Sequence, residues 1–168
     1  MQKQNRNPCR AIESSTKYNA KFKNDVKPCL LKNSENHCAY CDHYFWNAGE
    51  LNIEHFKSRK NHLKLETVYN NLYAACNSCN SRKRDDNYPD IEPHRPDNND
   101  YSFEDYYYFE PATGEIELLD EDDNTSKQTL HFLNLNNPDL KKARKNFCLS
   151  WYKEKERPGK SFRFIDLI

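Results

Sequence analysis

The chain has 168 residues, and its 26 basic and 26 acidic side chains cancel to a net charge of zero. Apolar residues make up 36% and aromatic residues 13%, so a modest core built on rings is possible and intrinsic disorder is disfavoured. With only three glycines there is no Gly-rich nucleotide-binding loop, and no apolar run reaches the roughly 20 residues that cross a bilayer.

Apolar spacing predicts a helix near the N-terminus. Tyr18, Phe22, Val26 and Leu30 recur every four residues, which is typical of an amphipathic helix over about 16–32 that Pro28 bends or shortens. Next in chain order we expect a turn at 37–41 and strands within 43–46 and 50–56. A short apolar run at 72–75 then leads to the second cysteine pair, and a short basic helix is expected from residue 79.

The second half of the chain is predicted to contain one hairpin and two helices. The hairpin joins 101–109 to 115–119 after an irregular connector over 86–100. One helix is capped within 124–126; the other starts at Asn137-Pro138, ends at Pro158-Gly159 and carries Leu140, Ala143, Phe147 and Trp151 on one face. The expected divisions are 1–36 (tail and helix), 37–88 (core), 89–123 (acidic connector and hairpin) and 124–168 (helical extension).

Two paired-cysteine steps predict a structural zinc site. Cys38, Cys41, Cys76 and Cys79 form a C-x2-C…C-x2-C set, and four thiolates from two short turns make the closed tetrahedral site that zinc takes in structural roles. A total of seven cysteines and no apolar leader in MQKQNRNPCR favour metal ligation in a cytoplasmic protein over a disulfide framework. We therefore expect the remaining cysteines, Cys9, Cys29 and Cys148, to be ordinary reduced or packed thiols.

The segment between the cysteine pairs resembles the HNH endonucleases, whose ββα-metal fold is often clamped by two such pairs. The matching residues are HCAYC at 37–41, IEH at 53–55, NNLYAAC at 70–76 and CNSRK at 79–83. A weaker similarity that extends to 129–144 is to the nuclease subunits of Septu-type and retron-associated anti-phage systems, in which a partner ATPase is common. The resemblance implies an α+β fold with a small zinc-stapled ββα-metal core, an N-terminal helix and a mainly α-helical C-terminal extension.

The resemblance also implies roles for single residues. The motif letters fall on His55, Asn71 and Asn80, with His55 as the general base that takes a proton from an attacking water. Asn71 would hold the loop and orient His55. Glu54 and Asn80 would offer oxygen ligands to a catalytic Mg²⁺ or Mn²⁺. Strand alternation places Glu54 opposite His55, although the alternation can relax at the end of a strand.

Charge along the chain points to a nucleic-acid partner. Residues 56–84 carry seven basic side chains against Glu66 alone, whereas 85–123 carry fifteen acidic ones against Arg95 alone. The candidate phosphate contacts are Lys57, Arg59, Lys60, Arg82, Lys83 and Arg84. The acidic segment is either a soluble insert whose aromatic residues cover the core or a docking surface or lid.

We therefore expect a metal-dependent endonuclease that hydrolyses phosphodiester bonds in DNA, with RNA not excluded. The resemblance implies an ATPase subunit as a partner, and the protein could also form a homodimer or a hetero-oligomer. We expect no association with a membrane. The alternative is a non-catalytic zinc-stapled module that binds nucleic acid or protein, in which Glu54, His55 and Asn80 have no joint purpose.

Overall fold

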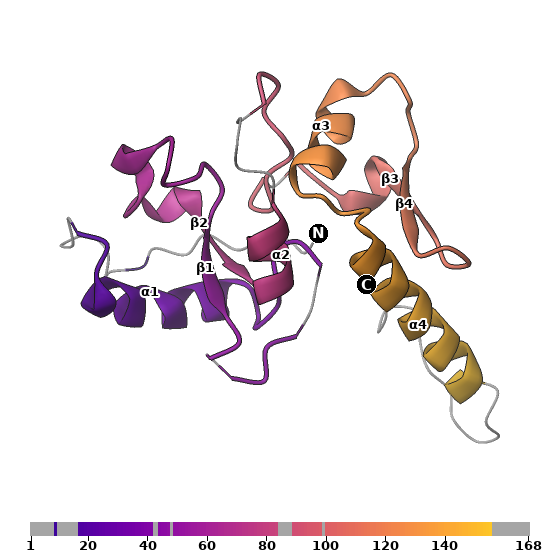
Figure 1. Ribbon diagram of the computed structural model, residues 1–168, viewed down its shortest axis with the longest axis horizontal. Helices are drawn as coiled ribbons and strands as arrows, with labels where there is room; N and C mark the ends of the chain where they lie inside the picture. The colour runs from indigo at the N-terminus through magenta and orange to yellow at the C-terminus, as the bar shows by residue number, and fades with distance from the viewer. Residues whose placement is uncertain are drawn as a thin grey trace.

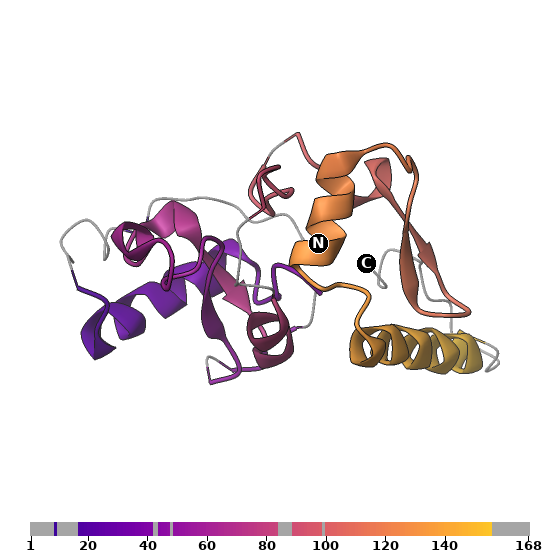
Figure 2. The same cartoon turned by 45° about the horizontal axis from the view of Figure 1, so that its top comes forward.

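The computed structural model describes residues 9, 17–41, 44–47, 49–83, 89–98 and 100–155, the last five by backbone alone. Two groups of elements lie side by side: α1, β1, β2 and α2 in one, and β3, β4, α3 and α4 in the other (Figures 1 and 2). Helices and two small antiparallel sheets alternate along the chain, which confirms the predicted α+β class.

Helix α1 (Ala20–Asn33) closes one side of the first group. The side chain of Asn19 caps it by accepting a hydrogen bond from the Phe22 N–H (2.9 Å). Phe22, Val26 and Leu30 are buried along one face, as their four-residue spacing predicts. Pro28 lies inside the helix without ending it.

A disulfide joins Cys9 to Cys29 of α1. The expectation that both would be unpaired thiols is therefore wrong. The sequence could not reveal the pairing, because the two cysteines are 20 residues apart and only the folded chain brings them together. Cys148 is free, as expected.

Strands β1 (Asn52–His55) and β2 (Leu72–Ala75) form an antiparallel ribbon in which His55 pairs with Leu72 and Glu54 with Tyr73. All four residues of β2 are buried, and α1 packs against this strand. Helix α2 (Asn77–Arg82) follows directly and packs on β1, so a ββα unit occupies the predicted place in the chain. A strand is expected within 43–46. Among the described residues of this segment, Tyr44 forms a single antiparallel bridge with His37.

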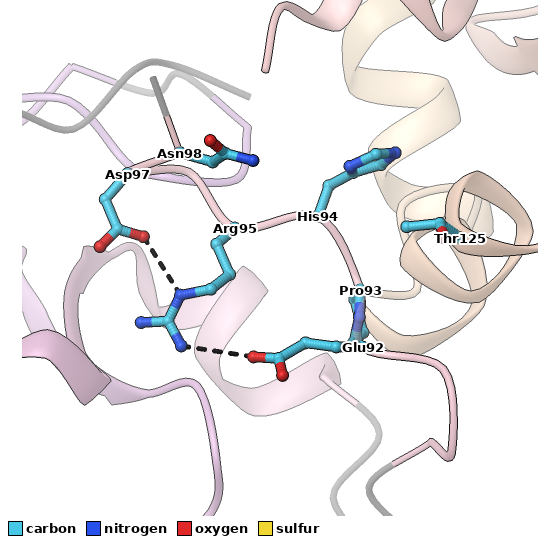
Figure 3. Close-up of a pocket in the computed structure, with 7 residues that line it drawn as sticks. All are labelled: Glu92, Pro93, His94, Arg95, Asp97, Asn98 and Thr125. Atoms are coloured by element: carbon cyan, nitrogen blue, oxygen red, sulfur yellow. Dashed lines mark hydrogen bonds and ion pairs between the residues drawn. The ribbon is translucent and has the colours of Figure 1, made fainter. Parts of the chain in front are cut away.

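The segment 89–98 ties the two groups together. The Tyr73 hydroxyl donates to the Asp97 carboxylate, and the Arg95 guanidinium donates to the Asn70 carbonyl and lies over the rings of Phe56 and Tyr73. His94 points the other way, toward α3, where its Nε2 lies 3.1 Å from Ser126 Oγ (Figure 3). A shallow pocket of about 360 Å³ lies along this segment, with Arg95 held between Glu92 and Asp97 (Figure 3).

In the second group, β3 (Tyr107–Glu110) and β4 (Glu115–Leu118) form the predicted hairpin. Its turn ends at Gly114, where φ is +76° and a Cβ would lie 2.0 Å from the Lys141 carbonyl oxygen, so only glycine fits. Helix α3 (Asn124–Phe132) is capped by Asp123, one residue before the predicted cap, through the N–H groups of Thr125 and Ser126.

Helix α4 (Pro138–Lys155) starts where Asn137-Pro138 predicts, with the Asn137 carboxamide accepting from the Leu140 N–H. Leu140 is buried, but Ala143 and Phe147 are exposed, so the predicted apolar face is covered only at its first turn. The predicted helix end at Pro158-Gly159 and the Trp151 side chain lie outside the described residues. Among the described helices, none combines the length and the apolar character that a bilayer crossing requires.

Candidate functional site

The four predicted zinc ligands converge between β1–β2 and α2. The Sγ atoms of Cys38, Cys41, Cys76 and Cys79 all lie within 4.8 Å of one another. The Cys41 and Cys76 sulfurs are 3.7 Å apart, close to the roughly 3.8 Å edge of a tetrahedron with Zn–S bonds of about 2.3 Å. Backbone N–H groups also point at the sulfurs, from Cys76 to Cys38 Sγ (3.3 Å) and from Cys79 to Cys76 Sγ (3.4 Å). The donor set and its spacing fit a structural zinc ion.

His55 ends β1, and one of its ring nitrogens is fixed by a backbone carbonyl. Nε2 lies 3.0 Å from the Glu66 carbonyl oxygen, which can only accept, so Nε2 carries the proton and Nδ1 keeps a lone pair. Burial lowers the pKa of His55 below its ordinary 6.5, outweighing the Glu66 hydrogen bond, which raises it. The imidazole is therefore neutral at neutral pH and has a basic nitrogen available in Nδ1.

Tyr18 borders this imidazole, and sequence reasoning missed it. Its ring and the His55 imidazole form a T-shaped pair with a centroid distance of 5.0 Å. Two cations lie over the same ring, the Arg59 guanidinium at 4.2 Å and the Lys23 ammonium at 4.9 Å. Tyr18 entered the sequence analysis only as a member of the helical repeat, and its proximity to His55 depends on how α1 packs on the ribbon.

Asn71 closes the loop that leads away from His55. Its Oδ1 accepts from the Lys57 N–H (2.8 Å), while its Nδ2 donates to the carbonyls of Lys57 (2.9 Å) and Leu65 (3.3 Å). The side chain is buried. These contacts connect the segment after β1 to the start of β2 without the carboxamide facing solvent.

Glu54 lies on the other side of β1 from His55. Its buried Oε1 accepts from the Lys83 ammonium and, at 3.5 Å, from the Tyr40 hydroxyl. The alternation of the strand thus persists to its end, and the two side chains contact different partners. Since they are adjacent, their Cα atoms stay about 3.8 Å apart and both flank the same strand end.

Asn80 lies on α2, and Lys83 is the residue that follows the end of this helix. The Lys83 ammonium reaches Glu54, and α2 packs on β1. No hydrogen bond of the half-buried Asn80 side chain involves another described residue. A carboxylate from β1 and an amide oxygen from α2 are hard donors of the type that Mg²⁺ or Mn²⁺ takes.

Within the described part of the chain, however, the sulfur cluster is the one group of three or more His, Cys, Asp or Glu side chains close enough to share an ion. A hard cation at Glu54 and Asn80 would therefore draw its other ligands from water or substrate.

The predicted phosphate contacts divide into three kinds. Lys60 is exposed, as such a contact requires. Lys57 and Arg82 are partly exposed and Arg59 is exposed, and all three are ion-paired, with Glu92, Asp139 and Glu66 respectively. Lys83 differs from the expectation, because its ammonium is buried against Glu54. Arg84 lies outside the described residues.

We compared the chain with curated proteins and with models of protein families. No curated protein matches the chain. The family model described as HNH endonuclease matches residues 38–86, which include the four cysteines, Glu54, His55, Asn71 and Asn80. This segment is therefore similar to HNH endonuclease domains, and its four cysteines are positioned to bind a metal.

Proposed function

We propose that this protein is a metal-dependent HNH endonuclease that hydrolyses phosphodiester bonds in DNA. The observation that carries the proposal is the hydrogen bond between His55 Nε2 and the Glu66 carbonyl, inside the segment matched by the family model. This bond selects the tautomer with a basic Nδ1, and the lowered pKa of His55 keeps that nitrogen unprotonated at neutral pH.

In the proposed reaction, His55 Nδ1 takes a proton from the water that attacks phosphorus. Glu54 and Asn80 would hold a divalent ion, Mg²⁺ or Mn²⁺, that acts as a Lewis acid on the scissile phosphate and stabilises the leaving oxygen. Asn71 keeps the backbone around Lys57 and Leu65 in place, so that the Glu66 carbonyl stays aligned with His55. The products would carry 3′-hydroxyl and 5′-phosphate ends.

Basic residues on the loop after β1 and on α2 would hold the nucleic-acid backbone. Lys57, Arg59, Lys60 and Arg82 keep exposed or partly exposed cationic groups on these two elements. Such contacts position a duplex without reading its sequence. Arg84 belongs to the same proposed set by its place in the basic run.

The experiment is a plasmid-nicking assay of the full chain loaded with zinc. We expect Mg²⁺ or Mn²⁺ to stimulate nicking, EDTA to abolish it, and His55→Ala to lose it while keeping its zinc. His62→Ala, a histidine in the same loop, serves as the matched control and should nick as the wild type does. Cleavage by His55→Ala at the wild-type rate would refute the base assignment.

A non-catalytic binding module is the second candidate, and one observation favours it. The Glu54 carboxylate already has a cationic partner in Lys83, and no second carboxylate or histidine among the described residues joins it in a possible metal site. This candidate predicts nucleic-acid binding that depends on zinc and on the basic residues, without nicking under any divalent ion.

We further propose that the nuclease acts in the cytoplasm in an anti-phage system with an ATPase partner. The support is the sequence similarity that extends from 53–83 into 129–144, together with four thiols that must stay reduced to hold zinc. One site cuts one strand, so double-strand breaks would need a second copy. Co-purification with the product of a neighbouring ATPase gene, and native mass measurement of the complex, test these assignments.

A further inference from the structure

The ammonium group of Lys83 is a buried cation with three oxygen partners. Its Nζ donates to Glu54 Oε1, to the carbonyl oxygen of His55 and, at 3.2 Å, to that of Phe56. The side chains of Lys83 and Glu54 are only 2% and 3% exposed. Three donors meet three acceptors, so the ammonium is satisfied away from water.

These contacts place a positive charge on the carboxylate that the proposed function assigns to a divalent ion. A cation bound to Glu54 would lie within a few ångströms of Nζ, since both would touch one carboxyl group. Burial weakens the screening of that repulsion, so the two cations disfavour each other more strongly than they would in water. The Tyr40 hydroxyl on the same Oε1 further reduces the acceptor capacity left for an ion.

We propose that Lys83 is a built-in competitor of the catalytic divalent ion: it neutralises Glu54 and weakens the affinity of this site for Mg²⁺ or Mn²⁺. The proposal rests on the proposed nuclease function, whose metal site it concerns. It gives Lys83 a different role from the phosphate contact expected from the basic run. It also predicts that the free protein loads the catalytic ion weakly, which limits cleavage at low divalent concentration.

The test measures Mn²⁺ affinity without nucleic acid, using the zinc-loaded full chain and electron paramagnetic resonance of free Mn²⁺. Lys83→Met removes the charge but keeps an unbranched side chain, and we expect Mn²⁺ to bind at least tenfold more tightly than to the wild type. Lys64→Met removes an exposed lysine from the same basic segment and should leave the affinity unchanged. Equal or weaker Mn²⁺ binding by Lys83→Met overturns the proposal.

A double variant locates the effect. Lys83→Met with Glu54→Gln should lose the gained affinity, because the carboxylate that binds the ion is gone. If the double variant binds Mn²⁺ as tightly as Lys83→Met, the ion does not compete with Lys83 for Glu54 and the proposal fails.

Zinc content and circular dichroism establish that each variant is folded. Should Lys83→Met fail to fold, the wild type provides the readout through the ¹⁵Nζ resonance of Lys83, assigned by its loss in Lys83→Arg. Saturating Mg²⁺ should shift that resonance, and an unchanged resonance refutes the competition.

Different experimental results would refute the competition by Lys83 and the proposed nuclease function. Tighter Mn²⁺ binding by Lys83→Met without metal-dependent nicking by the wild type refutes the nuclease and supports the competition. Nicking by the wild type with unchanged Mn²⁺ affinity in Lys83→Met refutes the competition alone.

Discussion

The carboxamide of Asn71 forms a pair of hydrogen bonds with the backbone of Lys57, accepting from its N–H at 2.8 Å and donating to its carbonyl at 2.9 Å. A third bond, from Nδ2 to the Leu65 carbonyl at 3.3 Å, reaches the residue next to Glu66. One buried side chain thus fixes both ends of the loop whose Glu66 carbonyl holds His55.

Replacing Asn71 by Ala should destabilise the protein and slow cleavage. The change leaves one N–H and two carbonyl groups without their partner, and unsatisfied buried groups cost about 1–3 kcal/mol each, so we expect a loss of about 3 kcal/mol. Chemical denaturation measures this loss. Asn70→Ala, at the adjacent and exposed position, should stay within about 0.5 kcal/mol of the wild type. Similar losses in both variants would contradict the assignment of the motif asparagine to Asn71.

If His55 is the general base, the cleavage rate should depend on pH in a specific way on the acid side. His55 acts only when it is neutral, so the rate should fall as the pH drops through its pKa, and burial places that pKa below 6.5. Single-turnover nicking between about pH 5 and about pH 8 measures the limb. A midpoint above 6.5 would show that His55 is not shielded as described or is not the base.

Loss of one sulfur ligand should remove zinc and unfold the ββα unit. Because binding free energy at a structural zinc site is also folding free energy, Cys76→Ser should give a protein with little zinc and reduced helix content. Elemental analysis and circular dichroism measure both. Cys148→Ser removes a free thiol of α4 outside the cluster and should keep full zinc occupancy. Zinc retention by Cys76→Ser would rule out the four-thiolate site.

Glu66→Gln should strengthen nucleic-acid binding without disturbing His55. The Glu66 side chain pairs with Arg59 at 3.1 Å, whereas the bond to His55 comes from its backbone carbonyl. Exposed pairs are worth about 0–1 kcal/mol, so freeing Arg59 should tighten binding by up to about fivefold at low salt and steepen the salt dependence. Glu35→Gln removes the same charge at an exposed residue outside this loop and controls for net charge. Equal effects of the two changes would mean that Arg59 makes no specific contact.

Local features of the sequence predicted the framework of the fold. The cysteine pairs, the alternation of β1, the cap at Asn137 and the glycine of the hairpin turn each depend on residues a few positions apart. Their physical causes act within a turn or a strand, so the sequence carries them directly. The contact between the two cysteine pairs is the exception, because Cys38 and Cys79 are far apart in the chain. It could be predicted because four thiolates in two such pairs are typical ligands of one structural zinc ion.

Contacts between distant segments could not be predicted in this way. Lys83 reads as one more cation in a basic run, and only the packing of α2 on β1 turns it inward to Glu54. Tyr18 reads as a core residue of a helical repeat, yet it borders His55. Charge and periodicity describe single elements, so they do not reveal which element faces which.

The position of Tyr18 bears on where this chain could be shortened without loss of its core. The matched segment starts at residue 38, but Phe22, Val26 and Leu30 of α1 belong to the same core as Phe56 and Tyr73. A fragment cut at the edge of the match would expose the underside of the ribbon and strip the aromatic wall from the imidazole. We therefore expect the smallest fragment that folds around this site to begin ahead of α1, and a transplant of the motif into another scaffold to need a substitute for that helix.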